Sequence, residues 1–160
     1  DTRLMYYTYH KYCRNRFIGL ISQRTLNQLK NSGNMRLTRN EQALEIILNS
    51  EVGFQQFEEQ TKVVTLLKEN TSQFGTRIFD FREYQKANTN PDGSANQKED
   101  GFLNLSYQPV LNTTDIEYIK EFIARVGYYR NTLNSYSIEL QDGFPFLENA
   151  INELKKNYRL

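Results

Sequence analysis

Only a few side chains in the sequence could act as a base, a nucleophile or a metal ligand. The chain has one histidine and one cysteine, His10 and Cys13, which lie three residues apart and share one face of a helix. A zinc site requires three or four ligands, and no further His or Cys is present to complete one. The sequence also lacks a glycine-rich phosphate loop and the carboxylate and histidine patterns of hydrolases. We therefore expect His10 and Cys13 to pack in an apolar stripe, and we expect no catalytic residue and no cofactor.

One segment rich in asparagine has the spacing of a calcium-binding loop. Oxygen-bearing side chains occupy positions 1, 3, 5, 9 and 12 of the twelve-residue pattern, with glycine at position 6; the candidate ligands are Asn88, Asn90, Asp92, Asn96 and Glu99. Only two of these five are carboxylates, the first position is Asn where the pattern has Asp, and Pro91 interrupts the loop. Residues 90 to 93, Asn-Pro-Asp-Gly, also form a strong type I turn signal. The sequence therefore favours a polar turn over a calcium site.

The longest helical pattern runs through the middle of the chain, from residue 39 to residue 85. Thr38 and Glu41 stand three residues apart before an apolar-periodic run, which is the capping-box signature of a helix start. Apolar side chains then recur on one face at helical spacing: they are Leu44, Ile47, Leu48, Val63, Val64, Leu67, Phe74, Ile78 and Phe81. The phase of this stripe changes near Gly53, so we expect a bend there and a face buried in a packed core.

Residues 2 to 31 predict a first helix, because apolar side chains follow one another at helical spacing from Tyr6 to Leu29. Tyrosines mix with basic residues at its start, and two interpretations of this run stay open. It could be the aromatic and basic collar that follows a membrane span, or the aromatic core of a bundle with a solvated rim. Residues 31 to 34, Asn-Ser-Gly-Asn, supply a turn that would fold the second helix back against the first.

The composition changes after residue 85, and a polar loop is predicted over residues 86 to 101. A short apolar segment from Phe102 to Val110 follows, which we expect to lie as an extended strand across the end of the bundle.

Thr114 and Glu117 repeat the capping-box signature and open a last helix from 114 to 157. Its apolar residues keep one heptad register: they are Ile116, Ile119, Ile123, Val126, Leu133, Leu140, Phe144, Leu147, Ile151, Leu154 and Tyr158. We interpret this pattern as one helix kinked near Pro145; the alternative is a new helix with Pro145 in its first turn.

Length and composition define the broad class. At 160 residues the chain is long enough for one domain with a core and too short for two. We therefore predict a single all-α domain over residues 1 to 160, an antiparallel bundle of long helices built as two helical hairpins. The formal net charge is +1 and basic residues are spread among acidic ones, so the sequence has no electrostatic footprint for nucleic acid. It contains no run of about 18 apolar residues and no signal-peptide pattern.

Two stretches resemble uncharacterised bacterial proteins that have one membrane-spanning helix followed by an extracytoplasmic helical domain: residues 23 to 40, QRTLNQLKNSGNMRLTRN, and residues 155 to 160, KKNYRL. The shared signature is a helix, a Ser-Gly-Asn turn and a second helix, and the likeness covers most of the chain. The resemblance implies a location on the extracytoplasmic face of a bacterial membrane and a tether in a segment upstream of Asp1. It carries no active site, so no functional residue can be transferred.

Two functions fit these features. The first is a membrane-tethered, non-enzymatic helical module that binds a protein partner or a small ligand. The alternative is a structural oligomer without a ligand, in which the heptad positions after Ile116 mediate coiled-coil-like self-association. An enzyme ranks last, because the sequence lacks the reactive residues that catalysis requires.

Overall fold

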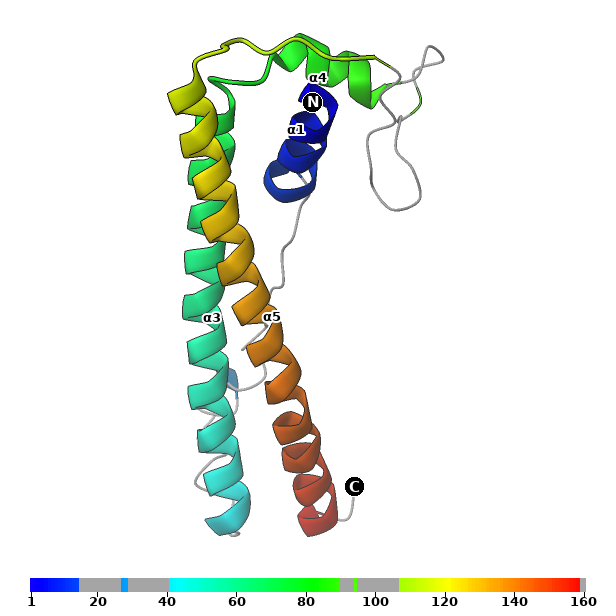
Figure 1. Ribbon diagram of the computed structural model, residues 1–160. Coiled ribbons are helices and arrows are strands. Elements are labelled where there is room, and N and C mark those ends of the chain that lie inside the picture. Colours follow the sequence, from blue (N-terminus) through cyan, green and yellow to red (C-terminus); the bar gives the residue numbers. More distant parts are fainter. Residues whose placement is uncertain (15–26, 29–40, 90–93, 95–106, 159–160) are drawn as a thin grey trace. The chain divides into compact units, whose positions relative to one another are not determined.

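The described part of the chain is almost entirely helical in the computed structural model (Figure 1). The structure describes residues 1–14, 27–28, 41–89, 94 and 107–158. The helices in these ranges are α1 (Thr2–Tyr9), the π-helix η1 (His10–Arg14), α3 (Glu41–Gly75), α4 (Phe81–Asn88) and α5 (Ile116–Tyr158). No strand occurs in these ranges, where an isolated antiparallel bridge joins Phe79 to Leu111. The predicted all-α class is confirmed.

The chain forms two compact units that share its long helices. Unit 1 contains Asp1–Phe17 and Val64–Thr132, and with them α1, η1, α4, the end of α3 and the first part of α5. Unit 2 contains Ile18–Val63 and Leu133–Leu160, and with them the first part of α3 and the rest of α5. A single domain built as two helical hairpins stays a prediction. Among the described residues, none of the helices combines the length and the apolarity that crossing a bilayer requires.

The middle helix is shorter than predicted, because α3 ends at Gly75 rather than at residue 85. The backbone N–H groups of Thr76 and Arg77 donate to carbonyls three residues earlier, at 3.2 and 3.1 Å, which tightens the last turn. Asp80 then begins a separate helix, α4, because its carboxylate accepts the N–H of Arg82 at 2.7 Å. The continuous helix from 39 to 85 is therefore wrong beyond Gly75.

The buried face of the middle segment is partly as predicted. Val64, Phe74 and Ile78 are buried, whereas Val63 and Phe81 are more than half exposed. Phe81 differs because it is the first residue of α4, so the periodicity of α3 does not determine its direction. Helix α3 continues through residue 53, where a bend was expected. The predicted helix start at residue 39 and its cap Thr38 lie outside the described residues.

The first predicted helix begins as expected at Thr2. Asp1 caps it by accepting the N–H of Arg3 at 3.0 Å, and at His10 it widens into η1. Most of the remaining prediction up to residue 31, and the turn at 31 to 34, lie outside the described residues.

The last helix, α5, is one continuous element, as predicted, and it passes through Pro145. The alternative of a new helix at Pro145 is therefore wrong. Its N-terminal cap differs from the prediction, because the carboxylate of Asp115, not Thr114, accepts the N–H of Glu117 at 2.9 Å.

The predicted polar loop begins later than expected, since α4 continues to Asn88. The described part of the extended segment, from residue 107, stays non-helical up to the start of α5.

Helix α5 buries a face that is rotated from the predicted heptad stripe. The stripe has two heptad positions. One of them is correct where its side chains are described, because Val126 is buried and Ile119, Leu133 and Leu140 are partly buried; the side chains of Leu147 and Leu154 lie outside the described ones. The other inward position lies one residue earlier than predicted, and the buried residues that occupy it are Phe122, Tyr129, Tyr136 and Ala150. The residues predicted for this position are instead more than half exposed: Ile116, Ile123, Phe144 and Ile151. Successive residues of a helix point about 100° apart. Because large aromatic side chains occupy most of the buried face, the apolar residues one position later point away from it.

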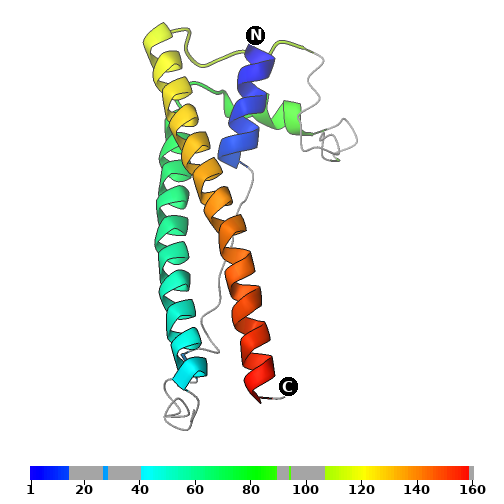
Figure 2. The same cartoon turned by 60° about the horizontal axis from the view of Figure 1, so that its bottom comes forward.

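The core of unit 1 consists mainly of aromatic side chains. Its buried members are Tyr6, Tyr9, Cys13, Phe74, Ile78, Phe79, Tyr84, Phe122 and Val126. Tyr9 stacks on Phe79 with ring centroids 4.5 Å apart. The Tyr6 hydroxyl donates to the carbonyl of Val110 at 2.7 Å and accepts the N–H of Asp80 at 3.0 Å. Helices α1 and α4 lie side by side in both views (Figure 1, Figure 2). The burial of Tyr6 and Tyr9 agrees with the second interpretation of the tyrosine run, in which it forms the aromatic core of a bundle.

In unit 2, α3 and α5 pack through polar and small residues as well as apolar ones. The hydroxyls of Thr61 and Tyr136 are 2.6 Å apart, and Thr61 also donates to the carbonyl of Phe57 at 2.8 Å. The Phe57 ring lies against Gly143, where an added Cβ would be 2.6 Å from the ring tip. Because Phe57 precedes Thr61 whereas Gly143 follows Tyr136, the two helices run in opposite directions in this unit.

Candidate functional site

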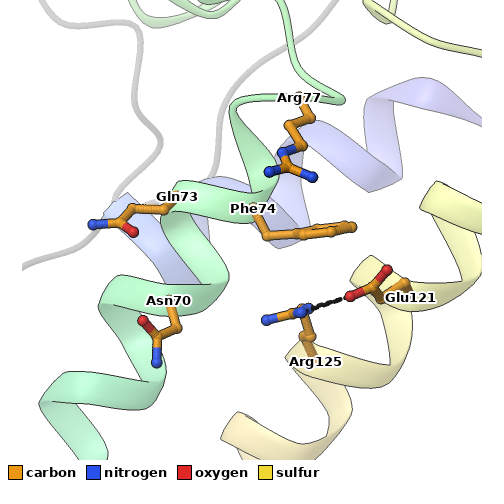
Figure 3. A pocket seen from close by; sticks show the side chains of 6 residues that line it. All are labelled: Asn70, Gln73, Phe74, Arg77, Glu121 and Arg125. Atoms are coloured by element: carbon orange, nitrogen blue, oxygen red, sulfur yellow. Dashed lines mark hydrogen bonds and ion pairs between the residues drawn. The ribbon is translucent and has the colours of Figure 1, made fainter.

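Unit 1 contains an open hollow of about 320 Å³ between the end of α3 and the first part of α5 (Figure 3). Five polar or charged side chains and one aromatic ring line it: Asn70, Gln73, Phe74, Arg77, Glu121 and Arg125. Ligand pockets commonly have volumes of roughly 300 to 1,000 Å³, so this hollow has room for one side chain or a small part of a ligand.

The Phe74 ring lies between the guanidinium groups of Arg77 and Arg125 (Figure 3). The guanidinium carbon is 5.7 Å from the ring centroid in Arg77 and 4.6 Å in Arg125. These cation–π contacts hold two long side chains in place while their N–H groups can still donate at the guanidinium edges. Phe74 is buried in the aromatic core of unit 1, and this core fixes the position of its ring between the two guanidinium groups.

The hollow carries more positive than negative charge. Arg125 donates through Nε and Nη2 to one carboxylate oxygen of Glu121, at 3.0 and 2.6 Å. Both side chains of this pair are more than two-fifths exposed, so the pair contributes only about 0 to 1 kcal/mol to stability. Within the described ranges Arg77 makes no ion pair. Two guanidinium groups therefore face one carboxylate, which leaves the site net positive.

Local helix geometry brings these groups together. Gln73 and Phe74 lie three and four residues after Asn70, so both neighbour Asn70 on the surface of the helix at the end of α3. The N–H of Arg77 donates to the carbonyl of Phe74, which places Arg77 one tight turn further on. A cation is favourable there, because the carbonyl end of a helix carries a partial negative charge. Arg125 lies one turn after its carboxylate partner in α5.

The chemistry of this hollow suits recognition of an anion. Guanidinium groups bind carboxylates and phosphates through two parallel hydrogen bonds. The side-chain amides of Asn70 and Gln73 add further donors and acceptors at the edge.

His10 and Cys13 lie in the core of unit 1, as predicted, with exposed fractions of 3% and 4%. His10 Nδ1 is 2.5 Å from the Tyr84 hydroxyl, while Nε2 has no hydrogen-bond partner in the described structure. Burial, and then the charge of Arg14, lower the pKa of His10 below 6.5. Burial raises the pKa of the Cys13 thiol to about 12. Both side chains are therefore neutral at pH 7, and the thiol is a poor nucleophile.

Of the five candidate calcium ligands, the described part of the structure contains one. Asn88 is the last residue of α4, whereas four ligands lie outside the described residues: Asn90, Asp92, Asn96 and Glu99. In the part of the chain that is described, no three or more His, Cys, Asp or Glu side chains are placed to hold a metal ion. The calcium loop stays a prediction.

Sequence reasoning did not identify the hollow. Arg77 and Arg125 lie far apart in the chain, so no local spacing connects them. The one local signal is the pair Glu121 and Arg125 at a spacing of four, which is common on any solvated helix. Phe74 was expected in the core, but its position between two cations appears only in the folded chain.

No family model matches the chain, and comparisons with curated proteins and with solved structures likewise find no match. The function is therefore inferred from the geometry of the chain itself.

Proposed function

We propose that this chain is a non-enzymatic helical module that binds an acidic segment of a protein partner at the hollow of Figure 3. The observation that carries the proposal is the position of the Phe74 ring between Arg77 and Arg125. Long side chains lose conformational entropy when a partner immobilises them. Because the ring already restrains both guanidinium groups, part of that loss occurs on folding rather than on binding.

A protein segment fits this site better than other anionic ligands. Arginine and aromatic residues dominate the residues that contribute most at protein interfaces. A carboxylate side chain of a partner is small enough for a hollow of about 320 Å³, and it can form two hydrogen bonds with one guanidinium. Nucleic acid is less suitable, because the formal net charge of +1 gives no extended basic surface.

The test uses a fluorescein-labelled hexaglutamate peptide, with binding followed by fluorescence anisotropy. Arg77→Gln and Arg125→Gln should each weaken binding several-fold, and added salt should weaken it further because the attraction is between exposed charges. Arg82→Gln is the matched control: it removes the same charge from an exposed residue of α4 that does not line the hollow. Absence of binding, or an equal loss in Arg82→Gln, would show that the hollow is not an acidic-peptide site.

Glu121→Gln should have the opposite effect. The Glu121 carboxylate occupies N–H donors of Arg125 that an acidic partner would use. Its neutralisation should therefore tighten hexaglutamate binding, whereas weaker binding would mean that Glu121 mainly positions Arg125.

The second candidate function is self-association through α5. It is supported by exposed apolar residues at one position of the heptad, Ile123 and Phe144 among them. In unit 1, Ile116 and Ile123 are seven residues apart, and Phe144 and Ile151 repeat this spacing in unit 2. Sedimentation across concentration separates the two functions: a dimer that Ile123→Ser disrupts favours self-association, and a monomer at every concentration favours the partner-binding module.

An extracytoplasmic location and a tether upstream of Asp1 are a separate proposal, which the resemblance to bacterial membrane-anchored proteins supports. The burial of Tyr6 and Tyr9 removes two members of the tyrosine run from any membrane-facing collar.

A further inference from the structure

Unit 1 has a second hollow, of about 140 Å³, which shares no lining residue with the hollow described above. Aromatic rings form most of its wall: they belong to Tyr9, Phe79, Phe81 and Tyr84. An apolar cavity of roughly 150 Å³ can hold one benzene molecule. The size and lining of this hollow therefore suit a single small ring.

The walls of this hollow are held in place by ring contacts. Tyr9 stacks on Phe79 at 4.5 Å with an interplanar angle of 18°, and it meets Tyr84 edge to face at 5.9 Å. Phe81 differs from these three rings because it is 58% exposed. An apolar ligand in the hollow would cover the Phe81 ring. Removing this apolar surface from water would stabilise the complex.

Arg14 supplies the charge in this hollow. Its guanidinium carbon is 5.4 Å from the centroid of the Tyr84 ring, and no ion pair connects it to a carboxylate among the described residues. It is the last residue of the π-helix η1, a type of helical turn that is frequent at functional sites.

The uncharged polar groups of the hollow are already hydrogen-bonded within the chain. The Thr76 hydroxyl donates to the carbonyl of Gln73 at 2.7 Å, and the Asn112 amide donates to the carbonyl of Phe79 at 3.1 Å. The Arg14 guanidinium lies within hydrogen-bonding reach of the Tyr9 and Tyr84 hydroxyls, and it is the charged group among the lining residues that the carboxylate of a ligand would contact.

We infer that this second hollow binds a small aromatic carboxylate. The ring of the ligand lies against the aromatic side chains, including Phe81, and its carboxylate pairs with Arg14. This site is independent of the proposed acidic-peptide site, because its cation and its lining residues are different.

The test compares three probes on the full chain by ligand-observed NMR titration: benzoate, benzamide and acetate. Benzoate should bind saturably, benzamide should bind several-fold more weakly because it lacks the charge, and acetate should not saturate because it lacks the ring. Saturation with acetate, equal affinity for benzoate and benzamide, or no saturation with benzoate would overturn the inference.

Variants connect the binding to this hollow. Arg14→Gln should reduce benzoate affinity to the level of benzamide, and Phe81→Ala should weaken both ligands. Phe81 is largely exposed, so its removal should leave the fold intact. Phe144→Ala, which shortens a similarly exposed ring in unit 2, and Arg82→Gln are the matched controls and should bind like the parent chain. Arg77→Gln should also leave benzoate binding unchanged; if it weakens benzoate and Arg14→Gln does not, benzoate occupies the acidic-peptide hollow and this inference is wrong.

Discussion

The ring of Tyr9 lies so close to Gly75 that no side chain fits between them. A Cβ added to Gly75 would overlap the edge of this ring. The ring cannot move away freely, because it is stacked on Phe79 and meets Tyr84 edge to face. The absence of a side chain at the last residue of α3 thus allows α1 to pack against the end of that helix.

Gly75→Ala should destabilise the chain by about 1 to 3 kcal/mol, the usual cost of forcing extra volume into a packed core. The measurement is the free energy of unfolding from urea denaturation. Gly127→Ala is the matched control in the same unit, because an added Cβ there meets no atom within 4 Å. It should be neutral or stabilising by up to about 1 kcal/mol, since alanine favours a helix interior. Equal effects of the two substitutions would mean that Tyr9 does not pack on Gly75.

Gly143 and Phe57 should be energetically coupled in unit 2. Gly143→Ala places a methyl group 2.6 Å from the ring tip, whereas Gly53→Ala enters open space. We expect Gly143→Ala to be less stable than Gly53→Ala by about 1 kcal/mol or more. In a Phe57→Ala background this difference should disappear, as a double-mutant cycle would show. Strict additivity of Gly143→Ala and Phe57→Ala would contradict the contact.

The stability of the chain should fall as the pH drops below about 6.5, through His10. Burial, and then the nearby Arg14, lower the pKa of His10 in the folded state, while its ring is hydrogen-bonded to Tyr84. The unfolded chain therefore binds a proton at a higher pH than the folded chain does, and protonation favours unfolding. The stabilising effect is complete above the unfolded pKa and is lost as the pH falls toward the lowered folded pKa.

Urea denaturation at several values between about pH 7 and about pH 5 measures this dependence. His10 is the only histidine, so His10→Gln should be less stable at neutral pH but should show a flatter pH profile over this range. The same slope in both proteins would assign the pH dependence to other groups.

The long helices could be predicted from the sequence because their signals accumulate over many residues. The continuity of α5 through Pro145 followed from a heptad pattern that kept its phase on both sides. Its exact face could not be read from the pattern, because Phe122 and Ile123 are both apolar neighbours. Which of the two turns inward depends on the helices packed against it, and here the aromatic ring does.

The end of α3 had a sequence signal that a continuous apolar stripe obscured. Asp80 and Glu83 stand three residues apart, which is the spacing of a capping box, and Gly75 precedes them. Ile78 extends the apolar periodicity because it is buried, but it lies in a turn and not in a helix. Periodicity reports burial, and it does not by itself show that the backbone is still helical.

The two hollows could not be predicted, because each joins residues that are distant in the chain. Phe74 and Arg125 meet only when α3 packs against α5, and Arg14 and Phe81 line one hollow only when η1 lies beside α4. Neither set has a local spacing of the kind that identifies a phosphate loop or a metal site.

The most direct test of the acidic-peptide site is an NMR titration that observes the side-chain Nε–H signals of the arginines as hexaglutamate is added. The Arg77 and Arg125 signals should shift together and saturate with one affinity, whereas those of Arg82 and Arg3, which do not line the hollow, should stay nearly unchanged. Shifts confined to other arginines, or none at Arg77 and Arg125 when the peptide is in large excess, would contradict the proposal that this hollow recognises an acidic partner.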